Sequence, residues 1–116
     1  MPPRDWQFRI QDMLDAIEKI REYTADLDAS TFSANPMVVD AVIRNLTLLG
    51  EAACALPSHV RQAHAEIPWN KMQSMRNALV HEYFGVSITI VWQTVSSDLA
   101  PLVPQLETLL RSDQES

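Results

Sequence analysis

Four side chains with complementary chemistry lie within eight residues near the middle of this chain: Arg76, Asn77, His81 and Tyr83. A guanidinium can hold phosphate oxygens through two parallel hydrogen bonds, and an imidazole can gain and lose a proton near neutral pH. On a helix, Asn77 and His81 are four residues apart and share a face. A cation for phosphate beside a proton carrier is the minimum requirement for metal-free cleavage of an RNA phosphodiester.

The same residues also have a plain structural interpretation. Arg, Asn and His are common on the solvent-facing side of a helix. Tyr83 fits an ordinary amphipathic position, with its ring packed and its hydroxyl in water. Spacing alone therefore does not distinguish a catalytic site from an ordinary helix surface.

The string Arg76-x4-His81-x-Tyr83 is similar to the Arg-x4-His-x-Tyr signature of HepT-like toxins, which belong to the HEPN ribonuclease superfamily. The resemblance covers roughly residues 5–110. Three further segments occur in the family's order: Leu49-Gly50-Glu51-Ala52-Ala53, Ile67-Pro68-Trp69 and Val91-Trp92. This ordered set is more specific than Arg-x4-His by itself.

The resemblance implies a toxin that is a metal-independent endoribonuclease, with tRNA among its candidate substrates and no cofactor. Members of the family dimerise so that two motif helices meet across a two-fold axis, which implies a homodimer with two Arg and two His in one cleft. The family's partner is a small MntA-type nucleotidyltransferase antitoxin, which adenylylates the motif tyrosine and so inhibits the toxin. In this chain that residue is Tyr83.

Each candidate residue has a role in the predicted reaction. His81 would act as general base or general acid, and Arg76 would stabilise the charge that develops on the phosphate oxygens. Asn77 would either hold a phosphate oxygen or orient His81. Glu51 is either a supporting partner of Arg76 or His81, or a surface carboxylate. Four apolar residues of the same helix are candidates for the dimer interface or the core: Met72, Met75, Leu79 and Val80.

Two other functions fit the same residues. A non-catalytic helical subunit could bind and position a substrate for a nucleotidyltransferase, with Arg76 and His81 holding phosphate without cleaving it. A scaffold without a site is a third interpretation, but it leaves the clustering of polar residues at 76–83 unexplained.

The composition restricts the class of protein. A chain of 116 residues with 47% hydrophobic residues and 2 Gly is typical of one packed helical domain spanning 1–116. A single Cys excludes an internal disulfide, and the sequence has neither a signal peptide nor an apolar run that could span a membrane, so we expect a cytoplasmic protein. The net charge of −6 opposes broad nucleic-acid binding and favours a partner with a basic surface. His59 and His64 are five residues apart, which does not predict a metal site.

Hydrophobic periodicity predicts an all-α, up-down bundle of four to five helices with a HEPN-like arrangement. We expect helices at about 5–28, 35–56, 57–66 and 69–84. Gly85 would end the last of these helices, and residues 29–34 would form a connection. Asn35 followed by Pro36 is a strong helix start. A final helix from about 88 to 109 is expected to kink at Pro101 and Pro104, because each ring removes a backbone donor.

Overall fold

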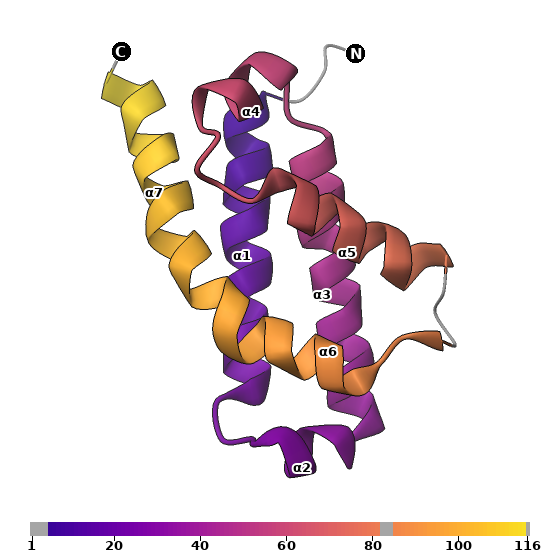
Figure 1. The fold of residues 1–116 in the computed structure, drawn as a ribbon. Coiled ribbons are helices and arrows are strands. Elements are labelled where there is room, and N and C mark those ends of the chain that lie inside the picture. The colour runs from indigo at the N-terminus through magenta and orange to yellow at the C-terminus, as the bar shows by residue number, and fades with distance from the viewer. Residues whose placement is uncertain (1–4, 82–84, 116) are drawn as a thin grey trace.

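A computed structural model describes residues 5–81 and 85–115 of the chain, and over these residues the predicted all-α fold is confirmed. The order is α1 (Trp6–Thr24), α2 (Ala29–Ser33), α3 (Pro36–Cys54), α4 (Ser58–Ala63), α5 (Trp69–His81), α6 (Ile88–Gln93), the π-helix η2 (Thr94–Asp98) and α7 (Leu99–Glu115). Figure 1 shows α1 and α3 side by side, with α5 and the α6–α7 segment on one face of this pair. In the part of the chain that is described, no helix is long and apolar enough to cross a bilayer.

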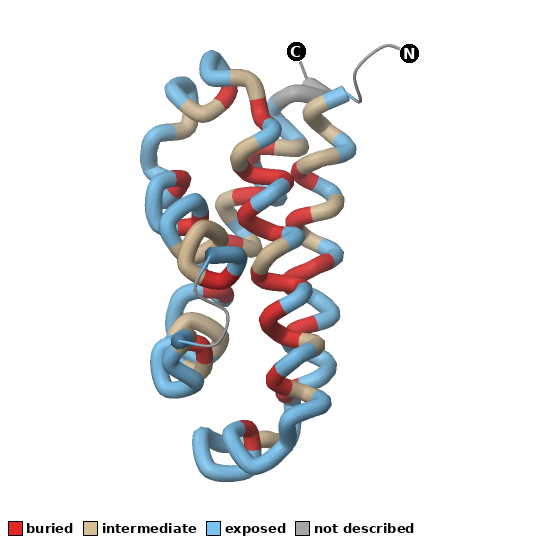
Figure 2. The backbone as a smooth tube through the Cα atoms, turned by 90° about the vertical axis from the view of Figure 1, so that its right-hand side faces the viewer, coloured by how far each residue is buried: buried red, intermediate tan, exposed pale blue. Residues whose placement is uncertain are grey.

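The core forms where α1 packs along α3. Apolar residues three and four positions apart lie on one side of α1 and are buried there: Ile10, Met13, Ile17 and Ile20. Val42, Leu46 and Leu49 of α3 face it. Figure 2 shows this buried strip running along both helices. The longest helices therefore form the rigid base on which α5 is carried.

The first helix is shorter than predicted, and the expected connection contains a helix. α1 ends at Thr24. Asp28, the predicted last residue of the first helix, is instead the N-cap of α2. The Asp28 carboxylate accepts a hydrogen bond from the Thr31 backbone N–H at 2.8 Å, and Thr31 Oγ1 accepts one from the Asp28 N–H at 2.8 Å. This reciprocal pair is a capping box. It satisfies two backbone donors and initiates a helix whose only buried residue is Phe32.

The start predicted for α3 is confirmed. Asn35 caps it by accepting a hydrogen bond from the Val38 N–H at 3.2 Å, and Pro36 is its first residue. α3 ends at Cys54, two residues before the predicted end, and α4 ends at Ala63. Gly85, which we predicted to end the motif helix, does not have positive φ, so it does not adopt the left-handed conformation that is common at helix ends. The predicted helix end at 82–84 lies outside the described residues.

The C-terminal helix bends at a π-helical turn and not at the predicted prolines. η2 spans Thr94–Asp98, directly before α7, and Pro104 lies inside α7. A π turn contains one extra residue, and the wider turn accommodates the ring of Pro101, which cannot donate a backbone hydrogen bond. The extra residue rotates the preceding turn by about 100°. Val91 is consequently buried in α6, whereas Ile88 is 39% exposed.

Candidate active site

Helix α5 carries the polar motif, and two kinds of contact position it. Its first residue, Trp69, is buried, and its indole N–H lies 3.1 Å from the Arg61 carbonyl and 3.0 Å from the His64 carbonyl. Along the helix, Met72 and Leu79 are buried among the core residues. α5 makes its main helix-to-helix contact with α3. The position of Arg76, between Met72 and Leu79, is therefore set by α3.

Arg76 lies directly against Gly50 of α3. A Cβ atom at position 50 would overlap Arg76 Cβ, and it would come within 3.0 Å of Arg76 Cγ and 3.1 Å of the Met72 carbonyl oxygen. The two backbones approach too closely at this point for any side chain larger than hydrogen. The residue that opposes Gly50 was identified only by the structure.

Glu51, the next residue of α3, forms an ion pair with Arg76. Arg76 Nε lies 3.3 Å from Glu51 Oε1, with the two side chains 25% and 53% exposed. The Nε atom itself is buried and has no aligned hydrogen bond, so the contact is an ion pair of imperfect direction. Of the two interpretations left open for Glu51, the contact with Arg76 is the one that the structure contains.

Asn77 is also in contact with Arg76. Arg76 Nη1 donates a hydrogen bond to Asn77 Oδ1 at 2.7 Å. Both side chains are half-buried. The structure thus brings together three of the predicted site residues, Glu51, Arg76 and Asn77, in one polar cluster at the α3–α5 contact.

His81 lies further along the motif helix than this cluster. It is the last residue of α5, and it is exposed. Five residues separate it from Arg76, which places the two about 140° apart around the helix axis at 100° per residue. Within one chain the helix therefore does not aim both groups at a single point. Tyr83, the predicted modification site, lies outside the described residues.

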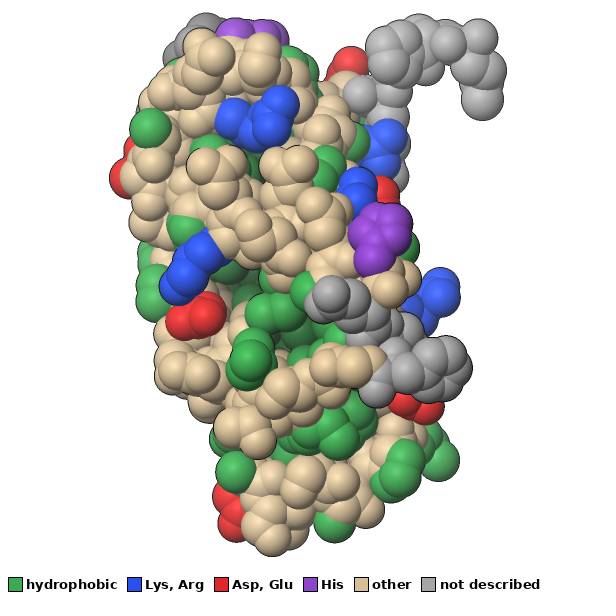
Figure 3. All heavy atoms as spheres, turned by 45° about the vertical axis from the view of Figure 1, so that its right-hand side comes forward, with side chains coloured by type: hydrophobic (Ala, Val, Ile, Leu, Met, Phe, Trp, Pro, Cys, Tyr) green, Lys and Arg blue, Asp and Glu red, His purple; other side chains and the backbone are tan. Residues whose placement is uncertain are grey.

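The four apolar candidates on α5 divide into core and surface. Met72 and Leu79 belong to the core, Met75 is half-buried against it, and Val80 is 47% exposed. Two isoleucines of α6 are exposed as well, Ile88 and Ile90. Figure 1 places the end of α5 and the start of α6 on the same side of the molecule. On the face shown in Figure 3, hydrophobic side chains are exposed beside histidine, basic and acidic ones.

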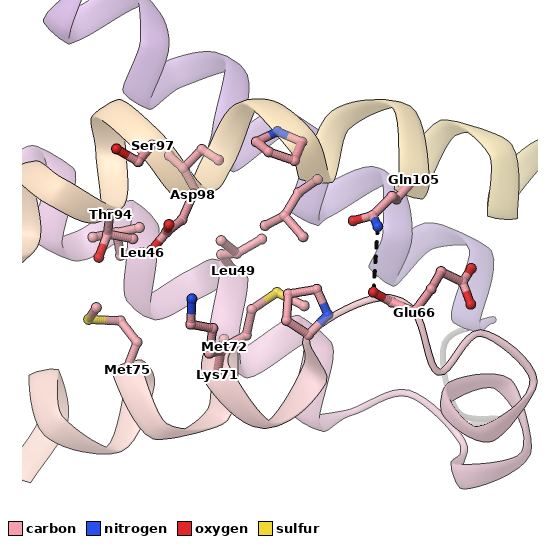
Figure 4. A pocket seen from close by; sticks show the side chains of 15 residues that line it. Leu46, Leu49, Glu66, Lys71, Met72, Met75, Thr94, Ser97, Asp98 and Gln105 are labelled. Atoms are coloured by element: carbon pink, nitrogen blue, oxygen red, sulfur yellow. Dashed lines mark hydrogen bonds between the residues drawn. The ribbon is translucent and has the colours of Figure 1, made fainter.

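A cavity of about 360 Å³ lies between α5 and the η2–α7 segment (Figure 4), and Gly50 of α3 also lines it. Its floor is apolar and includes Leu46, Leu49 and Met72, and its rim carries Lys71 and Asp98. Arg76 and His81 do not line it. Neither of these two motif residues therefore faces the cavity. Nothing in the sequence predicted that a cavity lies here.

Metal-binding residues are dispersed over the part of the chain that is described. Within residues 5–81 and 85–115 there is no group of three or more His, Cys, Asp or Glu that could hold a metal ion. His64 has one acidic neighbour, with Nδ1 3.7 Å from Glu66 Oε1.

Comparison with known proteins places these observations in a family. Residues 13–109 match the family described as Ribonuclease HepT-like. The chain is 38% identical over 100 residues to "Probable ribonuclease HepT" of Thermococcus cleftensis, covering 86% of this chain and 91% of that protein. It is 32% identical over 115 residues to a Methanocaldococcus jannaschii protein that bears the name "Putative RNase", covering 99% of both. No solved structure gives a significant match.

Proposed function

Because the chain belongs to the ribonuclease HepT-like family, we propose that it is a ribonuclease that uses Arg76, Asn77 and His81 of α5. The observation that carries this proposal is the cluster at the α3–α5 contact, where Arg76 is held by Glu51 and bonded to Asn77. A half-buried guanidinium with a fixed orientation is suited to binding a phosphate diester. Nearby exposed His81 supplies a group that can transfer protons.

The reaction we propose is transesterification within the RNA. The ribose 2′-OH attacks the adjacent phosphorus, and the 5′-oxygen of the next nucleotide leaves. One imidazole removes the proton of the 2′-OH, and a second protonates the leaving oxygen. Arg76 stabilises the charge that develops on the non-bridging oxygens. The products carry a 2′,3′-cyclic phosphate and a 5′-OH, and the step needs no metal because Arg76 supplies the positive charge.

Two imidazoles at one phosphate require two chains, since each motif has one His. We propose a homodimer in which two copies of α5 meet across a two-fold axis. The exposed residues Val80, Ile88 and Ile90 supply apolar surface near the motif for such a contact. The angle of about 140° between Arg76 and His81 also favours a composite site, because one copy alone does not converge on a phosphate.

Cleavage of RNA in the presence of EDTA tests this proposal. Purified protein is incubated with a tRNA mixture in excess EDTA, and the ends of the fragments are identified by their reaction with a phosphatase before and after mild acid. We expect fragments with cyclic phosphate ends. Intact RNA at micromolar enzyme, or cleavage that EDTA abolishes, would contradict the proposed mechanism.

We further propose that the chain is the toxin of a toxin–antitoxin pair whose antitoxin is an MntA-type nucleotidyltransferase. In this proposal, the antitoxin adenylylates Tyr83. A bulky anionic nucleotide two residues from His81 would occupy the region where RNA phosphate has to bind. Intact mass measured after co-expression with such an enzyme should rise by one AMP per chain, and a Tyr83→Phe variant should not gain this mass.

One observation favours the alternative, a substrate-binding subunit that does not cleave. Arg76 and Asn77 are hydrogen-bonded to each other in a single chain, whereas the helical spacing places His81 on another side of α5. This alternative predicts that tRNA binds without being cut and that Arg76→Ala weakens binding. Metal-independent cleavage by the wild-type protein would exclude it.

A further inference from the structure

We propose that Gly50 and Glu51 of α3 are positioning residues for Arg76, and that they fix which edge of its guanidinium faces the substrate. This inference rests on the proposed ribonuclease function only for its kinetic consequence. The orientation itself can be measured without any RNA.

A guanidinium has five N–H donors in one plane and no acceptor. The Nε atom of Arg76 is buried and lies 3.3 Å from Glu51 Oε1, in an ion pair without an aligned hydrogen bond. One Nη1 donor is given to Asn77 Oδ1 at 2.7 Å. The remaining donors are the second on Nη1 and the two on Nη2. Glu51 and Asn77 together therefore leave the end of the guanidinium opposite Cδ, and not its Nε side, for a phosphate.

The same contact fixes the amide of Asn77. Because Arg76 can only donate, the atom of Asn77 that receives this bond must be Oδ1. The Nδ2 hydrogens then point away from the guanidinium. In this proposal Asn77 Nδ2 is a second donor for a phosphate oxygen, the first of the two roles predicted for it.

Gly50 allows the Arg76 side chain to lie beside Glu51. With hydrogen at position 50, the Arg76 Cβ and Cγ atoms rest on the α3 backbone, one residue from Glu51. Any Cβ at position 50 would force Arg76 or the whole of α5 outward. The Nε atom would then leave Glu51, since a fixed α3 cannot follow it.

The orientation can be tested by NMR on protein labelled with ¹⁵N-arginine. A buried Nε–H exchanges slowly with water, and the Nε atoms of Arg61 and Arg76 are both buried. We therefore expect two protected Nε–H signals, of which one disappears in Arg76→Lys. In Glu51→Ala this signal should lose its protection, while Glu51→Gln, which keeps an oxygen near Oε1, should retain most of it. Glu107→Ala, an exposed carboxylate on α7, is the matched control and should change nothing. Unchanged protection in Glu51→Ala would overturn the proposal even if the protein is an active ribonuclease.

The kinetic test separates positioning from a general structural role. In Glu51→Ala we expect kcat to fall by about 10- to 100-fold, because a displaced group stabilises the transition state poorly. KM should change much less, and Glu51→Gln should recover most of the activity. A loss confined to KM, or equal losses in Glu51→Ala and Glu51→Gln, would contradict positioning through the Nε contact.

Gly50 is tested through a double-mutant cycle with Arg76. Gly50→Ala should lower Tm in the wild-type background and lower it much less in an Arg76→Gly background, where the opposing Cβ and Cγ atoms are absent. Equal decreases in both backgrounds would show that Gly50 does not act through Arg76.

Discussion

The two sides of α5 differ in how closely they are packed. On the α3 side, Gly50 brings the backbones so near that Arg76 rests on α3, and Glu51 holds the guanidinium. On the side that faces η2 and α7, Met75 lines the cavity, whose floor is α3, because α5 makes few contacts with α7. A catalytic group needs a fixed direction, and only the tightly packed side supplies one. Changes on the α3 side should therefore alter activity, whereas changes on the cavity side should alter stability alone.

The largest expected effect is the loss of RNA cleavage in Arg76→Ala and His81→Ala. Each should lower kcat by about 10²- to 10⁴-fold, as expected for removal of a transition-state donor or a proton-transfer group. Circular dichroism and sedimentation should show that both variants stay folded with unchanged oligomeric state. Met75→Leu on the cavity side is the matched control. Wild-type cleavage by either alanine variant would remove that residue from the site.

The next largest effect compares two apolar truncations on α5. Leu79 is 2% exposed, so Leu79→Ala should destabilise the protein by about 2–5 kcal/mol, the range for a buried leucine. Met75→Ala removes a half-buried side chain at the rim of the cavity and should cost about 1 kcal/mol. Urea unfolding followed by circular dichroism measures both. Equal losses would show that the two sides of α5 are packed alike.

The two glycines provide a smaller, matched comparison. Gly50→Ala should destabilise the protein by about 1–3 kcal/mol, because overpacking outweighs the gain in helix propensity. Gly85→Ala has open space around the new Cβ and no positive φ, so it should stay within about 0.5 kcal/mol of the wild type. Thermal unfolding of both variants measures the difference. A stabilised Gly50→Ala protein would mean that α3 and α5 are not in close contact there.

The smallest effect is expected at α2, which makes its main contacts with α3 and α6 and not with α5. Hydrogen bonds from the Thr31 backbone and side chain lower the pKa of Asp28 below its ordinary value of 3.8. The capping interaction therefore stabilises the fold above pH 3.8 and is lost as the pH falls through the lowered pKa. Asp28→Ala should reduce the loss of stability in acid and leave cleavage unchanged. Acid unfolding of Asp28→Ala and of the exposed control Asp26→Ala checks this expectation.

Local patterns predicted most of the helices correctly, and the errors have identifiable causes. Asn35 and Pro36 began α3 as predicted, because an N-cap followed by proline acts within one turn. The Asp28–Thr31 capping box was in the sequence, but its Thr lies where Glu or Gln is usual, and we read the segment as a connection. The bend at η2 was displaced from Pro101, because the strain of a proline is relieved in the turn before it.

The sequence alone determined the candidate residues and the helical class, since residue chemistry and hydrophobic period are local properties. Only the tertiary structure decided that Arg76 opposes Gly50 and that Glu51 lies beside its Nε. These contacts join residues that lie 26 and 25 positions apart in the sequence. Their partners depend on the rotation and height of α5 on α3, which the packing of Trp69, Met72 and Leu79 sets.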